Sequence, residues 1–467
     1  MENLSNRHIG AAGFMLIASV GGCCAQNVNS DKKPNIVIVL ADDLGWGDVG
    51  YHGSSIKTPN IDRLSQTGIQ LDRFYVTPIS SPTRAGLMTG KYPNRLGIRN
   101  DVIPPWRDYG IEPEEKMLPQ ELDRAGYNNR AIIGKWHLGH SRKEYYPLNK
   151  GFTHFYGHLN GAIDYFTHER EGELDWHNDW ESSYDKGYST DLITEHTVEC
   201  IKKYSKEGPF FIYVAYNAPH TPLQAKDDDL KLYGFDENEP RHGRDKTGHG
   251  NNVEQTFSAM VTCMDRGIGE IIKALKEVGE FDNTIFLFFS DNGAETGSSG
   301  ELRGNKHLEF DGGVRSPALL SWPAKLKGGQ IISQLTGFVD IMPTLLDITG
   351  IKSTADFDGI SILPVLRGNV ESIDRRFYLG RGAVVTNEWK FIEKGHNPRM
   401  RFEENMLFKI TSDVGESKNL IEQYPEIAED LRKFVIGYDT IQPKRPLPEF
   451  SEGQDSFVAP KEWRVTK

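Results

Sequence analysis

Four uninterrupted apolar runs along the chain each end in a cluster of polar or charged residues. The runs cover residues 35–40, 130–133, 210–215 and 284–289. Because their hydrophobicity is continuous rather than alternating, each run fits a strand that is buried on both faces, as in a parallel sheet covered by helices. Apolar residues at helical spacing predict helices between the strands, over residues 60–67, 118–125 and 258–278. This alternation predicts an α/β fold with a doubly wound, mostly parallel sheet flanked by helices.

Beyond about residue 365 the apolar segments become shorter. Four of them predict the strands of a small antiparallel sheet, over residues 376–379, 383–385, 389–393 and 406–410, and a helical pattern follows over residues 425–438. We therefore predict a large domain over residues 33–365 and a smaller C-terminal subdomain, an antiparallel sheet plus a helix, over residues 366–467.

The first 25 residues have the pattern of an export signal. An apolar run over residues 11–20 follows Arg7 and His8, and it is too short to span a bilayer. We expect either cleavage after Ala25 or a bacterial lipoprotein signal that leaves a lipid anchor on Cys23. A buried N-terminal helix is the less favoured interpretation, because polar residues follow at once. Export predicts a periplasmic or cell-surface location.

The overall charge of the chain is acidic. Among 467 residues, 54 are Lys or Arg and 66 are Asp or Glu, which gives a formal net charge of -12. A protein with this charge has no general attraction for nucleic acid, so no nucleic-acid partner is expected. The four cysteines define no disulfide framework.

The clusters that follow the first and fourth predicted strands consist of oxygen donors. Asp42 and Asp43 follow the first strand, and Asp291 and Asn292 follow the fourth. Ligands of doubly wound folds bind beyond the carboxyl ends of the strands, and three carboxylates meeting there would repel one another without a cation. An all-oxygen set favours Ca²⁺ or Mg²⁺ over zinc. Taken singly, the first pair would be a helix N-cap and the second a tight turn, but their joint position favours a metal site.

A longer motif lies over residues 80–90, between the first two predicted helices. The run Ser80-Ser81-Pro82-Thr83-Arg84, continued by Thr89-Gly90, resembles the signature of the sulfatase family. In that family a maturation enzyme oxidises the first signature residue, here Ser80, to formylglycine. Further family landmarks follow in the same order, at Lys135-Trp136-His137, His220, Asp291-Asn292 and Lys306. The resemblance extends from about Lys33 to the C-terminus.

The resemblance implies a calcium-dependent sulfatase that acts on glycans. Hydrated formylglycine carries two hydroxyls on one carbon, so one can attack sulfur and the other can expel sulfate afterwards. The roles implied for individual residues are Ca²⁺ binding by Asp42, Asp43, Ser80, Asp291 and Asn292, orientation of the oxidised residue by Arg84, sulfate binding by Lys135 and Lys306, base catalysis by His137, and protonation of the departing sugar oxygen by His220 with Lys306.

Within the family the chain is most similar to the N-acetylgalactosamine 4-sulfatase group, the arylsulfatase B type, through residues 70–76 and 164–170. This implies exo-acting removal of 4-O-sulfate from N-acetylgalactosamine or galactose in sulfated glycan or glycosaminoglycan fragments. The alternatives are a 6-O-specific glycan sulfatase and a phosphatase or phosphodiesterase of the alkaline phosphatase superfamily that uses unmodified Ser80. Animal members carry Cys at this position, so Ser80 implies the bacterial type of maturation or a replaced Cys. Loops over residues 101–113 and 161–188 are expected to determine specificity.

Overall fold

The computed structural model describes residues 32–243, 247–353 and 355–465. The predicted export signal, including Cys23, lies outside the described residues. By their contacts, residues 33–467 form one compact unit, and the predicted domain boundary after residue 365 stays a prediction. Within the described ranges no helix is both long and apolar enough to cross a membrane.

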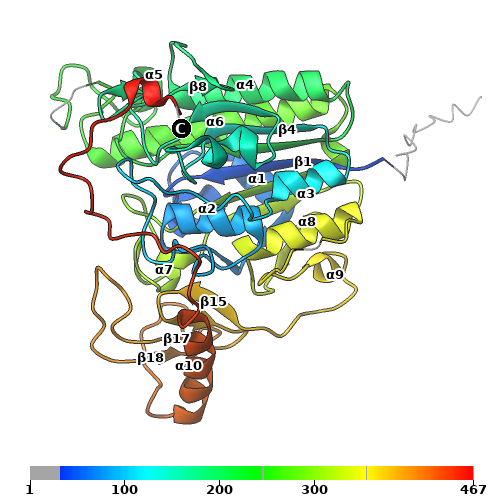
Figure 1. The fold of residues 1–467 in the computed structure, drawn as a ribbon, viewed down its shortest axis with the longest axis vertical. Helices are drawn as coiled ribbons and strands as arrows, with labels where there is room; N and C mark the ends of the chain where they lie inside the picture. Colours follow the sequence, from blue (N-terminus) through cyan, green and yellow to red (C-terminus); the bar gives the residue numbers. More distant parts are fainter. Residues whose placement is uncertain (1–31, 244–246, 354, 466–467) are drawn as a thin grey trace, which may run out of the picture. The chain divides into compact units, whose positions relative to one another are not determined.

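A ten-stranded sheet lies at the centre of this unit (Figure 1). Its strands are β1 (Asn35–Ala41), β2 (Ile69–Leu71), β4 (Asn129–Lys135), β5 (His154–His158), β8 (His177–Asn178), β9 (Glu181–Ser182), β10 (Phe210–Ala215), β11 (Thr284–Ser290), β12 (Ala318–Ser321) and β13 (Gln330–Ile332). Their spatial order is β13-β2-β12-β11-β1-β10-β4-β5-β8-β9. All neighbours from β11 to β5 are parallel, whereas β12 and β8 run antiparallel to their neighbours. The four strands predicted from apolar runs are β1, β4, β10 and β11, which confirms the mostly parallel sheet.

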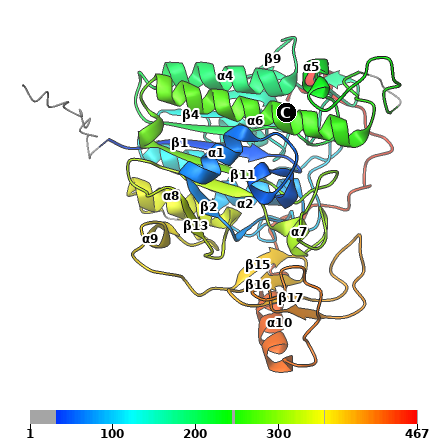
Figure 2. The same ribbon diagram turned by 180° about the vertical axis from the view of Figure 1, so that it is seen from behind.

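Helices cover both faces of the sheet (Figures 1 and 2). The α-helices of the described residues, including those outside the central sheet, are α1 (Pro59–Thr67), α2 (Ser80–Thr89), α3 (Leu118–Arg124), α4 (Ser189–Tyr204), α5 (Asp227–Lys231), α6 (Val253–Glu277), α7 (Asp311–Val314), α8 (Ile341–Thr349), α9 (Leu363–Leu366) and α10 (Pro425–Asp439). In β1, Ile36 and Ile38 belong to the core under α2, α3 and α8, whereas Val37 and Val39 belong to the core under α1, α4 and α6. Both faces are buried, which is why the apolar run is continuous.

The C-terminal region adds a four-stranded antiparallel sheet. Its strands are β15 (Phe377–Gly380), β16 (Ala383–Val385), β17 (Lys390–Ile392) and β18 (Met406–Phe408), paired in sequence order. Helix α10 packs on this sheet, with Leu431 and Val435 against Phe391. The predicted antiparallel sheet with one helix is therefore confirmed. Two further pairs of short strands lie outside these sheets: β3 (Phe74–Tyr75) pairs with β14 (Thr336–Gly337), and β6 (Glu169–Arg170) pairs with β7 (Glu173–Leu174).

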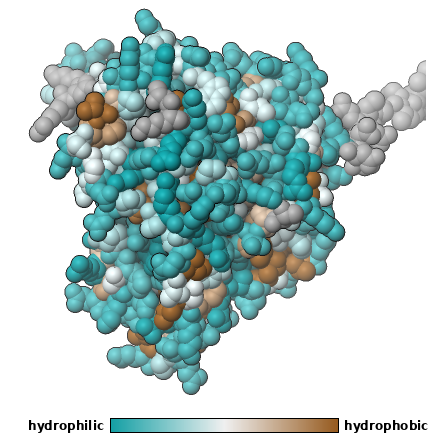
Figure 3. Space-filling model, in the orientation of Figure 1, coloured by the Kyte–Doolittle hydropathy of each residue, from teal (hydrophilic) through white to brown (hydrophobic). Residues whose placement is uncertain are grey.

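The surface face shown in Figure 3 is largely hydrophilic, with apolar residues scattered singly or in small groups. Scattered exposed apolar residues are normal for a folded domain. One group of buried polar residues lies beyond the carboxyl ends of the parallel strands, and it includes Asp42, Asp43, Lys135 and Asp291.

Candidate active site

The register of the sheet brings the two acidic clusters together. β1 and β11 are parallel neighbours, and Ala41 lies opposite Ser290 at their carboxyl ends. The residues that follow, Asp42 and Asp43 on one strand and Asp291 on the other, therefore leave the sheet at the same edge. The side chains of all three are buried.

Helix α2 supplies the residue at the centre of the cluster. Ser80 is the first residue of this ten-residue helix, and its Oγ lies 3.3 Å from both Asp42 Oδ1 and Asn292 Oδ1. Arg84 follows one turn later on the same face of the helix. A helix N-terminus presents free backbone N–H groups and a positive dipole end, so the position of Ser80 favours negative charge beside it.

Three cationic side chains pair with the three carboxylates. Lys135, the last residue of β4, donates to Asp42 Oδ2. Lys306 Nζ lies 2.7 Å from Asp43 Oδ2, and Arg84 Nη2 lies 2.8 Å from Asp291 Oδ2. The charges of these three pairs cancel, so the cluster carries no net charge when all six groups are ionised.

The carboxyl groups differ in how easily they ionise. Burial favours the neutral form of Asp42, yet the charges of Lys135, His220 and Arg84 outweigh it and lower its pKa to about 2. Burial also opposes ionisation of Asp43, but Lys306 and His220 lower its pKa. At Asp291 burial, reinforced by the negative charge of Asp42, raises the pKa to about 6 despite Arg84. The cations therefore keep Asp42 and Asp43 ionised, whereas burial makes Asp291 the carboxyl group of the cluster that is protonated most easily.

The donor atoms fit a Ca²⁺ ion. Asp42 and Asp43 each accept a hydrogen bond from a lysine on one carboxylate oxygen. The other oxygen of Asp42 lies beside Ser80 Oγ, and the other oxygen of Asp43 accepts a hydrogen bond from the Asn292 amide at 2.7 Å. A set of carboxylate, amide and hydroxyl oxygens is what Ca²⁺ prefers. An imidazole nitrogen of His220 lies within 4.8 Å of oxygens of Asp42 and Asp43, so this ring borders the ion site. A divalent cation would give the balanced cluster a net charge of about +2, which suits an anionic substrate.

Two histidines border the cluster. Burial, together with the positive charges of Lys135 and Arg84, lowers the pKa of His137 well below its usual value, so its ring is neutral at neutral pH. Its Nδ1 is buried with no hydrogen-bond partner among the described residues, and its backbone has a φ of 57°. Burial also lowers the pKa of His220, although Asp43, 3.7 Å from its Nε2, opposes this. Both rings are therefore mainly neutral at neutral pH, with a ring nitrogen free of its proton.

A cavity of about 230 Å³ opens onto Ser80. Its polar wall residues beyond the cluster are Asp101, Arg170, Thr221, Glu295, His307 and Arg399, and Phe450 adds an aromatic ring. The predicted specificity loops contribute Asp101 and Arg170. Residues of the C-terminal region that also line the cavity, Arg399 and Phe450, were not predicted from the sequence. Neither lies in a periodic pattern or motif, whereas His307 follows directly after Lys306 of the family landmark.

The structure brings every residue predicted for the site to this one cluster and cavity. These residues are Asp42, Asp43, Ser80, Arg84, Lys135, His137, His220, Asp291, Asn292 and Lys306. Their individual roles stay predictions.

Known proteins match the chain over most of its length. The family profile described as "Sulfatase" matches residues 34–351, and the profile "N-sulphoglucosamine sulphohydrolase, C-terminal" matches residues 303–437. Arylsulfatase J of Mus musculus is 30% identical, over 90% of this chain and 78% of its own. N-acetylgalactosamine-6-sulfatase of Homo sapiens is 33% identical, over 78% of this chain and 74% of its own. The crystal structure of Ps i-CgsB in complex with k-i-k-neocarrahexaose has a TM-score of 0.77 at 30% identity, over 91% of this chain and 97% of that chain.

Proposed function

Because the chain belongs to the sulfatase family and is a sulfuric ester hydrolase, we propose that it releases sulfate from glycans with a formylglycine made from Ser80 and a bound Ca²⁺ ion. One observation carries this proposal. Ser80 Oγ lies at the cavity, 3.3 Å from two oxygen donors, inside a ring of three carboxylates and three cations. The names of the relatives, a sulfatase of N-acetylgalactosamine and a complex with a neocarrahexaose, support a glycan substrate.

The residues around Ser80 prepare the site for a sulfate ester. Asp42, Asp43, Asp291 and Asn292, with residue 80, would hold Ca²⁺, which would supply positive charge beside the sulfate oxygens. The formylglycine would supply a pair of hydroxyls on one carbon, one to attack sulfur and one to lose a proton when sulfate leaves. Lys135 and Lys306 add N–H donors and positive charge where negative charge develops.

Arg84 and the two histidines act on orientation and on protons. Arg84 is fixed by two hydrogen bonds to Asp291 and lies one turn after residue 80 on α2, so its guanidinium would orient the oxidised residue beside the ion site. The neutral ring of His137 accepts a proton from the hydroxyl of residue 80. His220, with Lys306 beside it, donates a proton to the departing sugar oxygen.

The size of the cavity supports action on a terminal sugar. Its volume of about 230 Å³ lies below the roughly 300 to 1,000 Å³ of pockets that enclose drug-sized ligands, so it has room for one sulfated sugar unit. We propose a 4-O-sulfated N-acetylgalactosamine or galactose as the first substrate, held in a sulfated glycan or glycosaminoglycan fragment. The 6-O position is the alternative, because several relatives carry the name N-acetylgalactosamine-6-sulfatase.

The proposal includes the cellular setting. The apolar run over residues 11–20 supports export to the periplasm or cell surface, with Cys23 as a candidate lipid anchor. A formylglycine-generating enzyme must then oxidise Ser80 before the chain folds, because Ser80 is buried in the folded unit.

Sulfate release from four sugars tests the proposal. The substrates are N-acetylgalactosamine and galactose with sulfate on O4 or on O6, and the matching phosphate monoesters serve as controls. We expect fastest release from the 4-O-sulfates and little phosphate release. Faster release from O6 would change the proposed position of the sulfate to O6 and leave the proposed mechanism unchanged. Faster cleavage of the phosphate esters by protein with unmodified Ser80 would contradict the sulfatase mechanism.

A further inference from the structure

Two histidines and a cysteine meet at a second place on the sheet, away from Ser80. His154 is the first residue of β5, and Ala131 of β4 lies opposite it, four residues before Lys135. At about 3.3 Å per residue, His154 lies roughly 13 Å along the strands from the level of Lys135. His196 and Cys200 come from α4 and are one turn apart, so they share a face of that helix. The group is separate from the cluster around Ser80.

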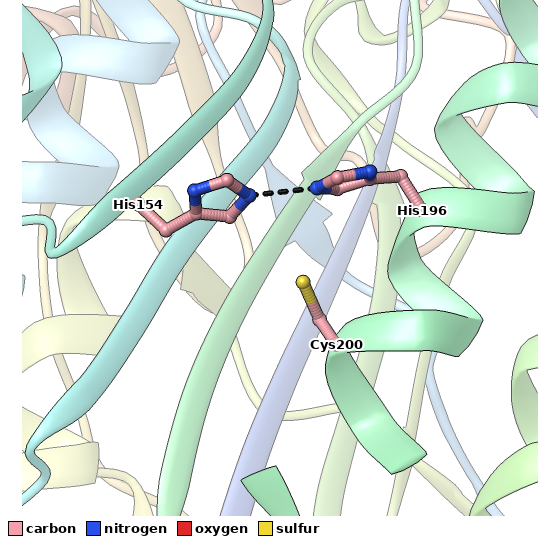
Figure 4. A group of neighbouring side chains, drawn as sticks. All are labelled: His154, His196 and Cys200. Atoms are coloured by element: carbon pink, nitrogen blue, oxygen red, sulfur yellow. Dashed lines mark hydrogen bonds between the residues drawn. The ribbon is translucent and has the colours of Figure 1, made fainter. Parts of the chain in front are cut away.

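The ligating atoms of this group point toward one another (Figure 4). The Nε2 atoms of His154 and His196 lie 2.7 Å apart, and the Cys200 sulfur lies within 4.8 Å of a ring nitrogen of each. Figure 4 shows the sulfur directed from the helix toward the pair of imidazoles. A thiol and two imidazoles in this arrangement are ligands that Zn²⁺ prefers.

Neighbouring groups fix the two rings. His154 donates from Nδ1 to Asp179 Oδ1 at 2.9 Å, and the same carboxylate oxygen accepts the Phe155 backbone N–H at 3.0 Å. This leaves Nε2 of His154 as the atom that faces the cysteine, in the carboxylate–histidine arrangement that orients zinc ligands. The His196 ring stacks on Tyr156 at 4.0 Å, which restricts its rotation.

We propose that His154, His196 and Cys200 bind a Zn²⁺ ion. The ion takes the place of the Nε2 hydrogen of a protonated His154 and of the thiol hydrogen of Cys200, and both protons go to solvent. Each imidazole keeps its hydrogen on Nδ1, so two neutral rings and a thiolate bind the ion. Two nitrogens bound at about 2.0 Å in a tetrahedral site lie about 3.3 Å apart, so the rings separate slightly when the ion enters. The His154 and His196 side chains are 17% and 19% exposed, so water has access to the fourth position.

The ion would link separate elements of the fold. It would join β5 to α4 directly, and through Asp179 it would also engage the turn between β8 and β9. These elements meet at one edge of the central sheet. The proposed site therefore strengthens that edge and takes no part in sulfate release.

Metal titration of the full-length protein, freed of any affinity tag, tests the proposal. Ca²⁺ at saturation occupies the oxygen ligands, and Zn²⁺ is then titrated by calorimetry, with Co²⁺ as a spectroscopic probe of thiolate ligation. We expect one Zn²⁺ per chain and a sulfur-to-cobalt charge-transfer band. Cys200→Ser should abolish the band. His196→Gln should weaken Zn²⁺ binding by at least about tenfold, since the loss of even a hydrogen-bond partner of a ligand typically costs about 10–100-fold in affinity.

Cys263→Ser is the matched control, because Cys263 is also a buried free thiol but lies beside Asp191 and Arg266. This variant should keep both the stoichiometry and the band. Sulfate release and circular dichroism show whether each variant is folded, and His154→Gln and His196→Gln test the same ligand set if Cys200→Ser fails to fold. No Zn²⁺ bound by the wild-type protein, a cobalt complex without the band, or equal losses in Cys263→Ser would overturn the proposal.

Discussion

The cluster around Ser80 and the group of His154, His196 and Cys200 differ in their donor atoms and in their charge. The cluster around Ser80 consists of oxygen donors, and each of its buried carboxylates pairs with a lysine or arginine. The group of His154, His196 and Cys200 offers two nitrogens and a sulfur at a partly exposed edge of the sheet. The first arrangement suits a hard cation and also an anion bound beside it, whereas the second suits only a borderline metal ion.

The two clusters also differ in the residues that surround them. Around Ser80 three further cations and two histidines surround the oxygen donors, and a cavity gives a substrate access to them. The described residues around His154 include no such set of cations, and its partner Asp179 is an acid. A metal ion at the first place would lie beside a substrate cavity, whereas the ion proposed at the second would connect β5 to α4.

The largest expected difference between the clusters is the effect of removing their central side chains. Ser80→Ala should lower sulfate release by on the order of 10⁴-fold or more, because the attacking oxygen is lost. Cys200→Ala should change turnover by less than about twofold. Initial rates on one sulfated sugar, with melting temperatures as a check on folding, measure both. A strong loss of turnover in folded Cys200→Ala would contradict the claim that Cys200 takes no part in sulfate release.

The next effect is that of removing calcium. EGTA should lower turnover by on the order of 10²-fold, since the ion stabilises charge that develops on the sulfate group. Added Ca²⁺ should restore the rate, and Zn²⁺ should not, because the ligands are all oxygen atoms. Rates measured before and after chelation check this. Unchanged turnover in protein shown by elemental analysis to be metal-free would exclude the ion from the reaction.

A smaller and more selective effect is expected for His220. Its replacement by Ala should lower sulfate release from a sugar by about 10²-fold, because the sugar oxygen needs a proton to depart. An activated aryl sulfate needs little protonation, so its hydrolysis should fall by less than about tenfold. The ratio of kcat/KM for the two substrates is the measurement. Equal losses would assign His220 to sulfate binding instead.

The smallest expected effect concerns stability. Zn²⁺ at about 100 times its Kd should raise the free energy of unfolding by about 2.7 kcal/mol. For a protein of this length that corresponds to a few degrees in Tm. His196→Gln should remove this increase, and Cys263→Ser should retain it. Thermal unfolding followed by circular dichroism, with Ca²⁺ present throughout, separates the zinc effect from occupation of the oxygen cluster.

The parts of the fold that the sequence predicted are those with long-range regularity. The run that became β1 has apolar side chains on both faces, so its pattern required burial on both sides. The acidic pairs met as expected because parallel strands in register end at one edge. Strands β2, β8, β12 and β13 have only two to four residues, too few to show a period, and the sequence did not reveal them.

The parts of the site that the sequence missed depend on irregular chain. Arg399 and Phe450 reach the cavity from segments whose paths are fixed by distant contacts, such as the hydrogen bond from Trp106 Nε1 to the Phe450 carbonyl. The group of His154, His196 and Cys200 was equally hidden. Only the one-turn spacing of His196 and Cys200 was visible in the sequence, and their pairing with His154 depends on how α4 crosses β5.

The mass of the peptide that contains Ser80 tests the central claim most directly. Trypsin releases residues 74–84 by cutting after Arg73 and Arg84. In active protein made with a formylglycine-generating enzyme, this peptide should be about 2 Da lighter than the encoded sequence, with the change at Ser80 rather than Ser81 on fragmentation. Sulfate release should rise in proportion to the converted fraction. Full activity in protein whose Ser80 is unmodified would contradict the account.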